Sequence, residues 1–211
     1  MLRQLSLFPL NVVLFPNVKL PLHVFEDRYK TMIQRCLEGD SRFGVVLIKS
    51  GQEVGAPANP HTVGTVARII SVKELRQGRM YLTVSGEERF RIHAISDDTP
   101  YLEARVDILR NNCLEQVGKD ELKSAREILG RYVQVLQGLR GSWTRVPNIP
   151  DDLSELSYFI ADVLQADNAQ KQDLLEEDSD RTRLIEGAEI MRDNAEELKR
   201  ILASGLTRRN N

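Results

Sequence analysis

The chain has 211 residues, of which 41% are hydrophobic and 28% are charged, and its formal net charge at pH 7 is −2. This size and composition are typical of a globular protein with one large domain or two small ones. No apolar run reaches the roughly 18 residues of a membrane span, and prolines interrupt the N-terminal segment where a signal peptide would need an unbroken apolar stretch. The sequence therefore predicts a cytoplasmic protein that does not cross a membrane.

Three prolines divide the apolar segment between residues 7 and 25. Pro9, Pro16 and Pro21 each lack a backbone donor and restrict φ to a narrow range. A proline inside a strand is tolerated only at an edge or a bulge. The segment is therefore predicted to form short extended pieces joined by bends.

A helix is predicted over residues 26–38, because apolar side chains recur there at intervals of three and four residues and Gly39 follows as a stop. The rest of the chain up to residue 108 shows alternating or β-branched segments separated by turn residues. These predict strands, with a turn at 77–78 and a break at Gly86 between two of them. The predicted strands cover residues 43–48, 63–72, 79–84, 89–95 and 101–108.

The second half of the chain has helical periodicity instead. Apolar residues fall on one stripe in each of three segments, 121–139, 153–164 and 184–202. Asp151 and Asp152 stand where the N-cap of the middle helix is expected. Three helices, each with one apolar face, are therefore predicted to pack in a bundle or on the sheet.

The change of periodicity near residues 111–112 marks the predicted domain boundary. The first half offers about six strands at the spacing of a closed or nearly closed sheet. The second half offers only helices. We predict an α+β protein with a mixed β-barrel lobe containing one helix over residues 1–112, an α-helical bundle lobe over 113–205 and a polar tail over 206–211.

Motifs for catalysis and cofactor binding are missing from the sequence. Its one Gly-Lys pair, Gly118-Lys119, is followed by Asp120 and lacks the earlier glycine of a phosphate-binding loop. A Gly-x-Ser-x-Gly hydrolase motif is absent as well. We therefore expect no enzymatic activity, no catalytic residues and no cofactor.

Cysteine and histidine usage also points away from a disulfide framework and from a metal site. Cys36 and Cys113 are too few for a framework and belong to no Cys-x-x-Cys pair. His23, His61 and His93 are isolated from one another and from both cysteines. Metal ligands are normally clustered at helical or turn spacing, so no metal is expected.

The proline-rich opening contains three blocks that together resemble a known family. Residues 7–10 read Leu-Phe-Pro-Leu, residues 13–17 read Val-Leu-Phe-Pro-Asn and residues 20–26 read Leu-Pro-Leu-His-Val-Phe-Glu. This stretch resembles the start of the substrate-binding N-terminal domain of Lon-type ATP-dependent proteases, which usually have Gly in place of Asn17. Further blocks in the family's order give a resemblance over roughly residues 5 to 200: 43–48, 63–69, 84–92, 101–104, 156–162 and 171–176.

This resemblance implies a PUA-like β-barrel fold for the first lobe and a helical bundle for the second. It also implies recognition of a protein or an unfolded polypeptide without the ATPase and Ser-Lys peptidase modules that follow this region in full-length proteases. The chain looks like a stand-alone bacterial member, and Met1 together with the polar tail favours a complete product. The oligomeric state leaves no mark in the sequence.

Apolar side chains of the proline-bent segment are the predicted contacts for a partner. The bends make it difficult to bury all of them in one sheet face, so some are expected to be exposed and available for binding. The alternative is that they fill the seam between the two lobes. The candidate residues are Phe15, Val18, Leu22, His23 and Phe25.

Two other functions remain as alternatives. PUA-like folds in other families hold RNA, which predicts a basic surface on the first lobe drawn from Arg68, Arg76, Arg79, Arg89, Arg91 and Arg105. Alternation along the strands turns Arg89, Arg91 and Arg105 toward solvent, but neighbouring acids neutralise their field, so nucleic acid is not favoured. A small-ligand sensor is the second alternative, and the sequence offers no convergent set of titratable residues for it.

Overall fold

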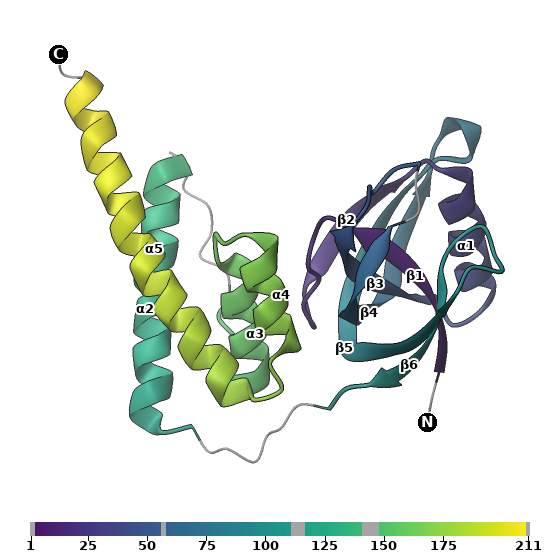
Figure 1. Cartoon of the computed structure of the whole chain (residues 1–211). Helices are drawn as coiled ribbons and strands as arrows, with labels where there is room; N and C mark the ends of the chain where they lie inside the picture. The colour runs from purple at the N-terminus through teal and green to yellow at the C-terminus, as the bar shows by residue number, and fades with distance from the viewer. Residues whose placement is uncertain (1–2, 56–57, 111–116, 141–147, 210–211) are drawn as a thin grey trace. The chain divides into compact units, whose positions relative to one another are not determined.

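The computed structural model describes residues 3–55, 58–110, 117–140 and 148–209 (Figure 1). It divides into two compact units, one made of residues 1–110 with 168–176 and the other made of residues 111–167 with 177–211. The first unit contains a mixed six-stranded sheet and the second is helical. The predicted fold class is confirmed, while the predicted boundary between residues 112 and 113 lies outside the described residues.

Five strands of the first unit close into a ring. The sheet order is β2-β5-β4-β3-β1-β6, and a further pairing between β5 and β6 joins the ends of the ring. Only the β1–β3 pair is parallel among the strand pairs of the described residues. The strands are β1 (Arg3–Leu10), β2 (Lys19–Val24), β3 (Arg42–Ser50), β4 (Asn59–Glu74), β5 (Met80–Ser96) and β6 (Glu103–Ile108).

The strand β5 organises this ring because its 17 residues reach three neighbours. Its first part pairs with β2, its last part pairs with β6, and β4 runs along most of its length. The strand β2 is therefore held outside the five-stranded ring by β5 alone, among the strands that the structure describes. A short turn at Arg76–Gly78, labelled η1, connects β4 to β5, as the sequence predicted.

The helix α1 (Asp27–Glu38) packs its apolar stripe on the core of the first unit (Figure 1). Met32 and Ile33 are fully buried there, and they join a cluster that includes Phe8 and Phe43. The helix ends at Gly39, whose backbone N–H donates to the carbonyl of Cys36. Both the apolar face and the stop signal agree with the sequence prediction.

The motif Phe15-Pro16-Asn17-Val18 forms a tight turn between β1 and β2. The N–H of Val18 donates to the carbonyl of Phe15 at 3.2 Å, and Asn17 has a φ of 64°. A proline followed by a residue with positive φ is the pattern of a type II turn. Asn tolerates this left-handed conformation better than most other side chains, so it can occupy a turn position that otherwise favours Gly.

Gly86 holds this turn against β5. Its N–H donates to the carbonyl of Val18 and its carbonyl accepts from the N–H of Asn17, both at 2.9 Å. A Cβ at position 86 would lie 2.2 Å from the carbonyl oxygen of Phe15, so only glycine fits. The sequence analysis predicted a strand break at Gly86. That prediction was wrong because this glycine serves a close backbone approach, and β5 continues through it.

The short helix α4 (Asn168–Glu176) clusters with the strands of the first unit, although the sequence analysis placed this segment in the helical lobe. Its carboxyl end is bound by Arg89 of β5, whose Nη1 donates to the carbonyl of Leu175 at 2.8 Å. The side-chain amide of Gln172 donates to the carbonyl of Val63 at 3.0 Å. A cation at this end of a helix also offsets the helix dipole.

The burial of Arg89 corrects a second expectation. Strand alternation predicted a solvent-facing side chain, yet Arg89 is only 1% exposed. Alternation identifies which face of a strand a residue occupies, but it does not reveal that a helix about 85 residues later in the chain covers that face. Arg89 is therefore not available to the basic surface that the RNA alternative requires.

The second unit consists of α2 (Lys119–Arg140), α3 (Leu153–Val163) and α5 (Asp180–Arg209). Both α2 and α3 pack on α5. The carboxylate of Asp152 accepts from the N–H of Glu155 at 3.0 Å and caps α3, as the sequence predicted. No helix of the described residues is long and apolar enough to cross a membrane.

A buried arginine joins α3 to α5 within this unit. Arg183 has no solvent exposure, and its Nη1 donates to the carboxylate of Asp180 at 2.7 Å and to the hydroxyl of Ser157 at 3.0 Å. Its guanidinium lies 4.0 Å from the centre of the Tyr158 ring. Because a buried charge is costly unless it is paired, these contacts fix how the two helices pack.

The turn at Asn17 yields the first prediction. Replacement by Gly keeps the positive φ and should leave the free energy of unfolding unchanged or slightly raised. Asn17→Ala forces alanine into the left-handed region and should lower the free energy of unfolding by about 1 kcal/mol. Urea unfolding curves of the three proteins measure the difference, and equal stability of the Gly and Ala variants would contradict the role of the turn.

The second prediction concerns Arg89. Arg89→Met leaves the buried carbonyl of Leu175 without this donor, a loss of about 1–3 kcal/mol. Backbone amides of residues 168–176 should then exchange hydrogen at least tenfold faster than in the wild type. Arg91→Met, on the same strand but exposed, is the matched control. Unchanged exchange in α4 of the Arg89 variant would show that the arginine does not hold the helix.

Candidate binding surface

A cavity of about 370 Å³ opens beside β2 in the first unit. Its walls come from the end of β1, from β2, from the start of α1 and from the loop after β3. Most of the lining side chains are apolar, which is typical of a site that binds by hydrophobic contact. The lining residues are Phe8, Leu10, Val12, Leu20, Pro21, Leu22, His23, Val24, Phe25, Glu26, Tyr29, Glu53 and Val54.

The strand β2 supplies both the inner wall and the rim of this cavity. Leu22 and Val24 are buried in the core, whereas His23 between them is exposed, as expected for alternating side chains on a strand. Phe25 follows immediately and is 45% exposed. Val54, on the loop after β3, lines the same cavity and is 52% exposed. Large apolar side chains thus remain open to solvent at the rim.

Three aromatic rings lie in a row at this rim, and we refer to Phe25, His23 and Tyr81 as the aromatic row. Tyr81 pairs with His23 across β5 and β2, and their ring centroids are 4.6 Å apart. The rings of His23 and Phe25 are 5.5 Å apart. Tyr81 is 51% exposed. The row extends the apolar cavity onto the surface, and contiguous exposed apolar area marks interaction sites.

Two ring contacts hold Tyr29 in the inner part of the cavity. Its ring stacks on Phe8 with centroids 4.1 Å apart, and the guanidinium of Arg28 lies 4.5 Å from the ring centre. Burial raises the pKa of the Tyr29 hydroxyl above its usual value. The phenol therefore stays protonated at neutral pH and presents a fixed, neutral surface.

Polar contacts fasten the loop after β3 to the start of α1. The carboxylate of Glu26 accepts from Arg28 Nε at 3.1 Å and from the N–H of Gly55 at 3.3 Å. The side chain of Glu53 accepts from the N–H of Asn11 at 3.1 Å. These bonds hold Val54 at the rim. The carboxylates at the cavity are engaged in structural hydrogen bonds, so the arrangement is suited to binding rather than to acid–base chemistry.

The structure separates the five residues predicted from the sequence. Leu22, His23 and Phe25 line the cavity. Phe15 is fully buried, because the turn that Gly86 holds directs its ring into the core, and it cannot contact a partner. Val18 is half-buried and packs against the core cluster.

Sequence reasoning missed Tyr81 and Val54. Tyr81 is an aromatic residue at an outward position of an alternating strand, and this pattern could have identified it. Nothing in the sequence around Val54 indicated its place at the rim.

The remaining arginines of the predicted basic surface are partly neutralised. Arg68 pairs with Glu87 at 3.5 Å, and Arg42 donates to the same carboxylate at 2.6 Å. Arg91 and Arg105 are exposed. A single acidic residue thus balances part of the positive field, as the sequence analysis expected. Among the described residues, no group of three His, Cys, Asp or Glu side chains could hold a metal ion.

Comparison with known proteins gives one consistent result. A family model described as the ATP-dependent protease La (LON) substrate-binding domain matches residues 4–193. A Lon protease of Cytophaga hutchinsonii is 30% identical over 184 residues, which are 80% of this chain and 21% of the relative. Lon protease 2 of Myxococcus xanthus is 29% identical over 82% of this chain and 21% of its own length. The chain thus spans about one fifth of these relatives.

Solved structures with the same fold include two Lon N-terminal domains. The Lon N-terminal domain protein from Xanthomonas campestris superposes with a TM-score of 0.66 at 25% identity, covering 86% of this chain and 95% of that protein. The N-terminal domain of a Mycobacterium avium complex Lon protease gives a TM-score of 0.68 at 18% identity, covering 90% and 99%. The second likeness shows the fold alone.

The third prediction tests which residues of the cavity belong to the folded core and which are free to contact a partner. Leu22→Ala removes a buried side chain and should lower the free energy of unfolding by about 2 kcal/mol or more. Phe25→Ala truncates a half-exposed ring and should change it by less than about 0.5 kcal/mol. Urea unfolding measures both. A large loss for Phe25→Ala would mean that the ring is part of the core and not a free contact surface.

Proposed function

The chain belongs to the family of LON substrate-binding domains, and on this premise we propose that it recognises proteins by binding apolar side chains of unfolded or extended polypeptide. The observation that carries the proposal is the apolar cavity beside β2, which opens onto the aromatic row of Phe25, His23 and Tyr81. The role is non-catalytic and is exercised in the cytoplasm. The proposed site residues are Leu22, His23, Phe25, Tyr81 and Val54.

Burial of the aromatic row would provide the binding energy. Phe25 and Tyr81 each leave about half of their surface in water, and burying apolar area yields roughly 25 cal/mol per Å². Aromatic side chains also dominate the energetics of protein interfaces. A polypeptide that offers one large apolar side chain to the cavity and a second one to the row would therefore gain most of its affinity from two contacts.

The edge of β2 favours side-chain recognition over strand addition. Pro21 lies in the middle of this six-residue strand and has no N–H to donate. Proline is tolerated in a strand where the missing donor faces away from the paired neighbour, so the outer edge of β2 lacks one donor. A partner cannot form an unbroken ladder there. Recognition through the cavity and the aromatic row also places few demands on the partner's sequence.

The fourth prediction tests this function with a permanently unfolded probe, a reduced and carboxymethylated protein labelled for fluorescence anisotropy. Phe25→Ser and Tyr81→Ser should each raise the Kd at least fivefold, because each removes a large exposed contact. Ile95→Ser is the matched control, since Ile95 is also an exposed apolar residue of the first unit at 44%. It should change the Kd less than twofold.

Two results would contradict the proposal. Equal affinity of the wild type and both aromatic variants would place the binding surface elsewhere. Binding of single-stranded RNA that is tighter than binding of the unfolded probe, and insensitive to the aromatic variants, would favour the RNA alternative. Circular dichroism and urea unfolding of every variant confirm beforehand that it is folded.

A further inference from the structure

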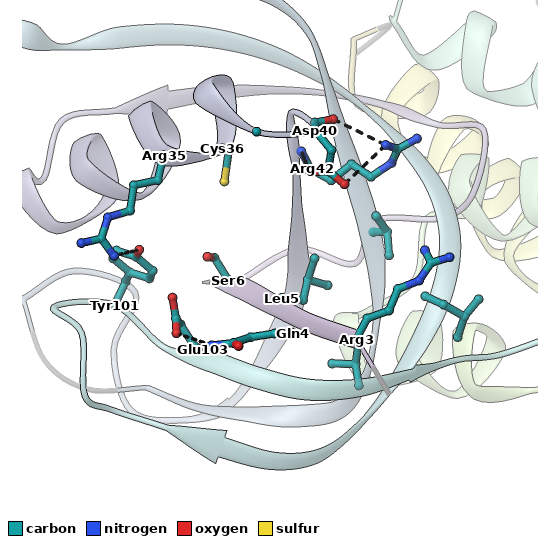
Figure 2. A pocket seen from close by; sticks show the side chains of 14 residues that line it. Arg3, Gln4, Leu5, Ser6, Arg35, Cys36, Asp40, Arg42, Tyr101 and Glu103 are labelled. Atoms are coloured by element: carbon teal, nitrogen blue, oxygen red, sulfur yellow. Dashed lines mark hydrogen bonds and ion pairs between the residues drawn. The ribbon is translucent and has the colours of Figure 1, made fainter. Parts of the chain in front are cut away.

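A second cavity, of about 270 Å³, lies where the start of β1 and the end of α1 meet β3 and β6 (Figure 2). It shares no lining residue with the cavity beside β2. Its volume is slightly below the roughly 300–1,000 Å³ of typical ligand pockets, which suits a small molecule. Unlike the first cavity, it presents charges of both signs.

One of the three arginines at this cavity is Arg35, in the last turn of α1. Its Nη1 donates to the hydroxyl of Tyr101 at 2.9 Å, and its guanidinium lies 5.9 Å from the centre of that ring. Tyr101 is buried, so it fixes the arginine in place. No carboxylate of the described residues lies within ion-pair distance of Arg35. Among the described residues, its other donors form no hydrogen bond.

One of the two carboxylates at this cavity is Glu103, at the start of β6. Its carboxylate accepts a hydrogen bond from the side-chain amide of Gln4 at 2.8 Å, and among the described residues no basic group pairs with it. Figure 2 shows Arg35 and Glu103 on the border of the same hollow, with Ser6 and Cys36 nearby. A guanidinium and a carboxylate thus line one cavity without pairing with each other.

The contrast with Arg42 makes this arrangement informative. Arg42 lines the same cavity but is engaged by Glu87 at 2.6 Å and by Asp40 at 3.5 Å. Arg35 and Glu103 are each hydrogen-bonded to a neutral side chain instead. Charged groups in a cavity that retain free bonding capacity are suited to a ligand with the opposite charge, and planar guanidinium matches a carboxylate.

Two further charged residues line the cavity, Arg3 and Asp40, of which Asp40 pairs with Arg42. The rest of the lining is apolar or neutral. Leu5, Val66, Val106 and Ile108 supply apolar surface. Burial raises the pKa of the Cys36 thiol to about 11, so it remains protonated and unreactive at neutral pH. The cavity therefore combines a group that can bind an anion, a group that can bind a cation and an apolar wall. Its cysteine is not poised for covalent chemistry.

We propose that this cavity binds a small zwitterion with an apolar side chain, a free α-amino acid of the size of leucine. Its carboxylate accepts hydrogen bonds from Arg35 and its ammonium group donates to Glu103. Its side chain packs on the wall that includes Leu5 and Val106. The site is independent of the proposed polypeptide-binding function, because it uses other residues.

The test is to titrate the full chain with three probes. Binding is measured by isothermal titration calorimetry or from the shifts of signals in ¹H–¹⁵N spectra. L-leucine carries both charges, N-acetyl-L-leucine lacks the ammonium group and L-leucinamide lacks the carboxylate. We expect leucine to bind at least tenfold more tightly than either analogue. Failure of leucine and phenylalanine to shift any signal at 20 mM, or equal binding of all three leucine probes, would overturn the proposal.

Two variants test which side chain binds which charged group of the ligand. Arg35→Gln should weaken leucine binding at least tenfold. Glu103→Gln keeps a hydrogen-bonding side chain beside Gln4 but should abolish the preference for leucine over N-acetyl-leucine. Arg91→Gln, exposed and outside the cavity, is the control and should bind as the wild type does. Tight binding of N-acetyl-leucine by the wild type would instead identify a site for carboxylates such as a polypeptide C-terminus. That result would contradict the proposal that the ligand is a zwitterion.

Discussion

The candidate binding surface depends on the contact between Gly86 and the turn at residues 15–18. The strand β2 lies outside the five-stranded ring, and β5 alone pairs with it among the described strands. Gly86 donates one hydrogen bond to this turn and accepts another from it, and together they fix where β2 begins. The absent side chain at position 86 lets the carbonyl of Phe15 approach. The bend buries Phe15 and leaves Phe25 exposed at the other end of β2. The turn therefore decides which apolar residues enter the core and which line the rim.

Among the described residues, each unit also has a buried arginine that is bonded to main-chain oxygens, and in the second unit also to a hydroxyl and a carboxylate. Arg89 binds the carboxyl end of α4, and Arg183 binds groups of α3 and the carbonyl of Glu177. An apolar side chain in these places would leave carbonyl groups without donors, and a buried unsatisfied acceptor costs about 1–3 kcal/mol. Apolar packing is non-directional, whereas a guanidinium requires its partners at particular positions. These two arginines therefore add specificity to helix placement that the apolar core alone does not provide.

Local sequence signals predicted the fold well, and contacts between distant segments explain what they missed. The prolines, the helix over residues 26–38 and the cap at Asp152 depend on neighbours within a few residues, so the sequence alone reveals them. The continuity of β5 through Gly86, the burial of Arg89 and the attachment of α4 each depend on a partner far away in the chain. The same dependence on distant contacts limits how much of the candidate site the sequence could predict. Three of the five predicted residues line the cavity, whereas Phe15 and Val18 do not. This difference follows from the turn that is hydrogen-bonded to Gly86.

The two proposed binding sites of the first unit differ in the chemistry of their linings, and we expect them to differ in selectivity for that reason. At the aromatic row, the proposed apolar contact would accept any sequence that offers a large side chain, since hydrophobic attraction is proportional to area and has no preferred direction. In the second cavity, Arg35 and Glu103 are each held by a hydrogen bond to a neutral side chain, and the proposed site would reject molecules that lack either charge. Helix α1 contributes to both, through Tyr29 near its start and Arg35 near its end. Its fully buried residues Met32 and Ile33 hold the helix in the core between these ends, so one rigid element positions residues of both proposed sites.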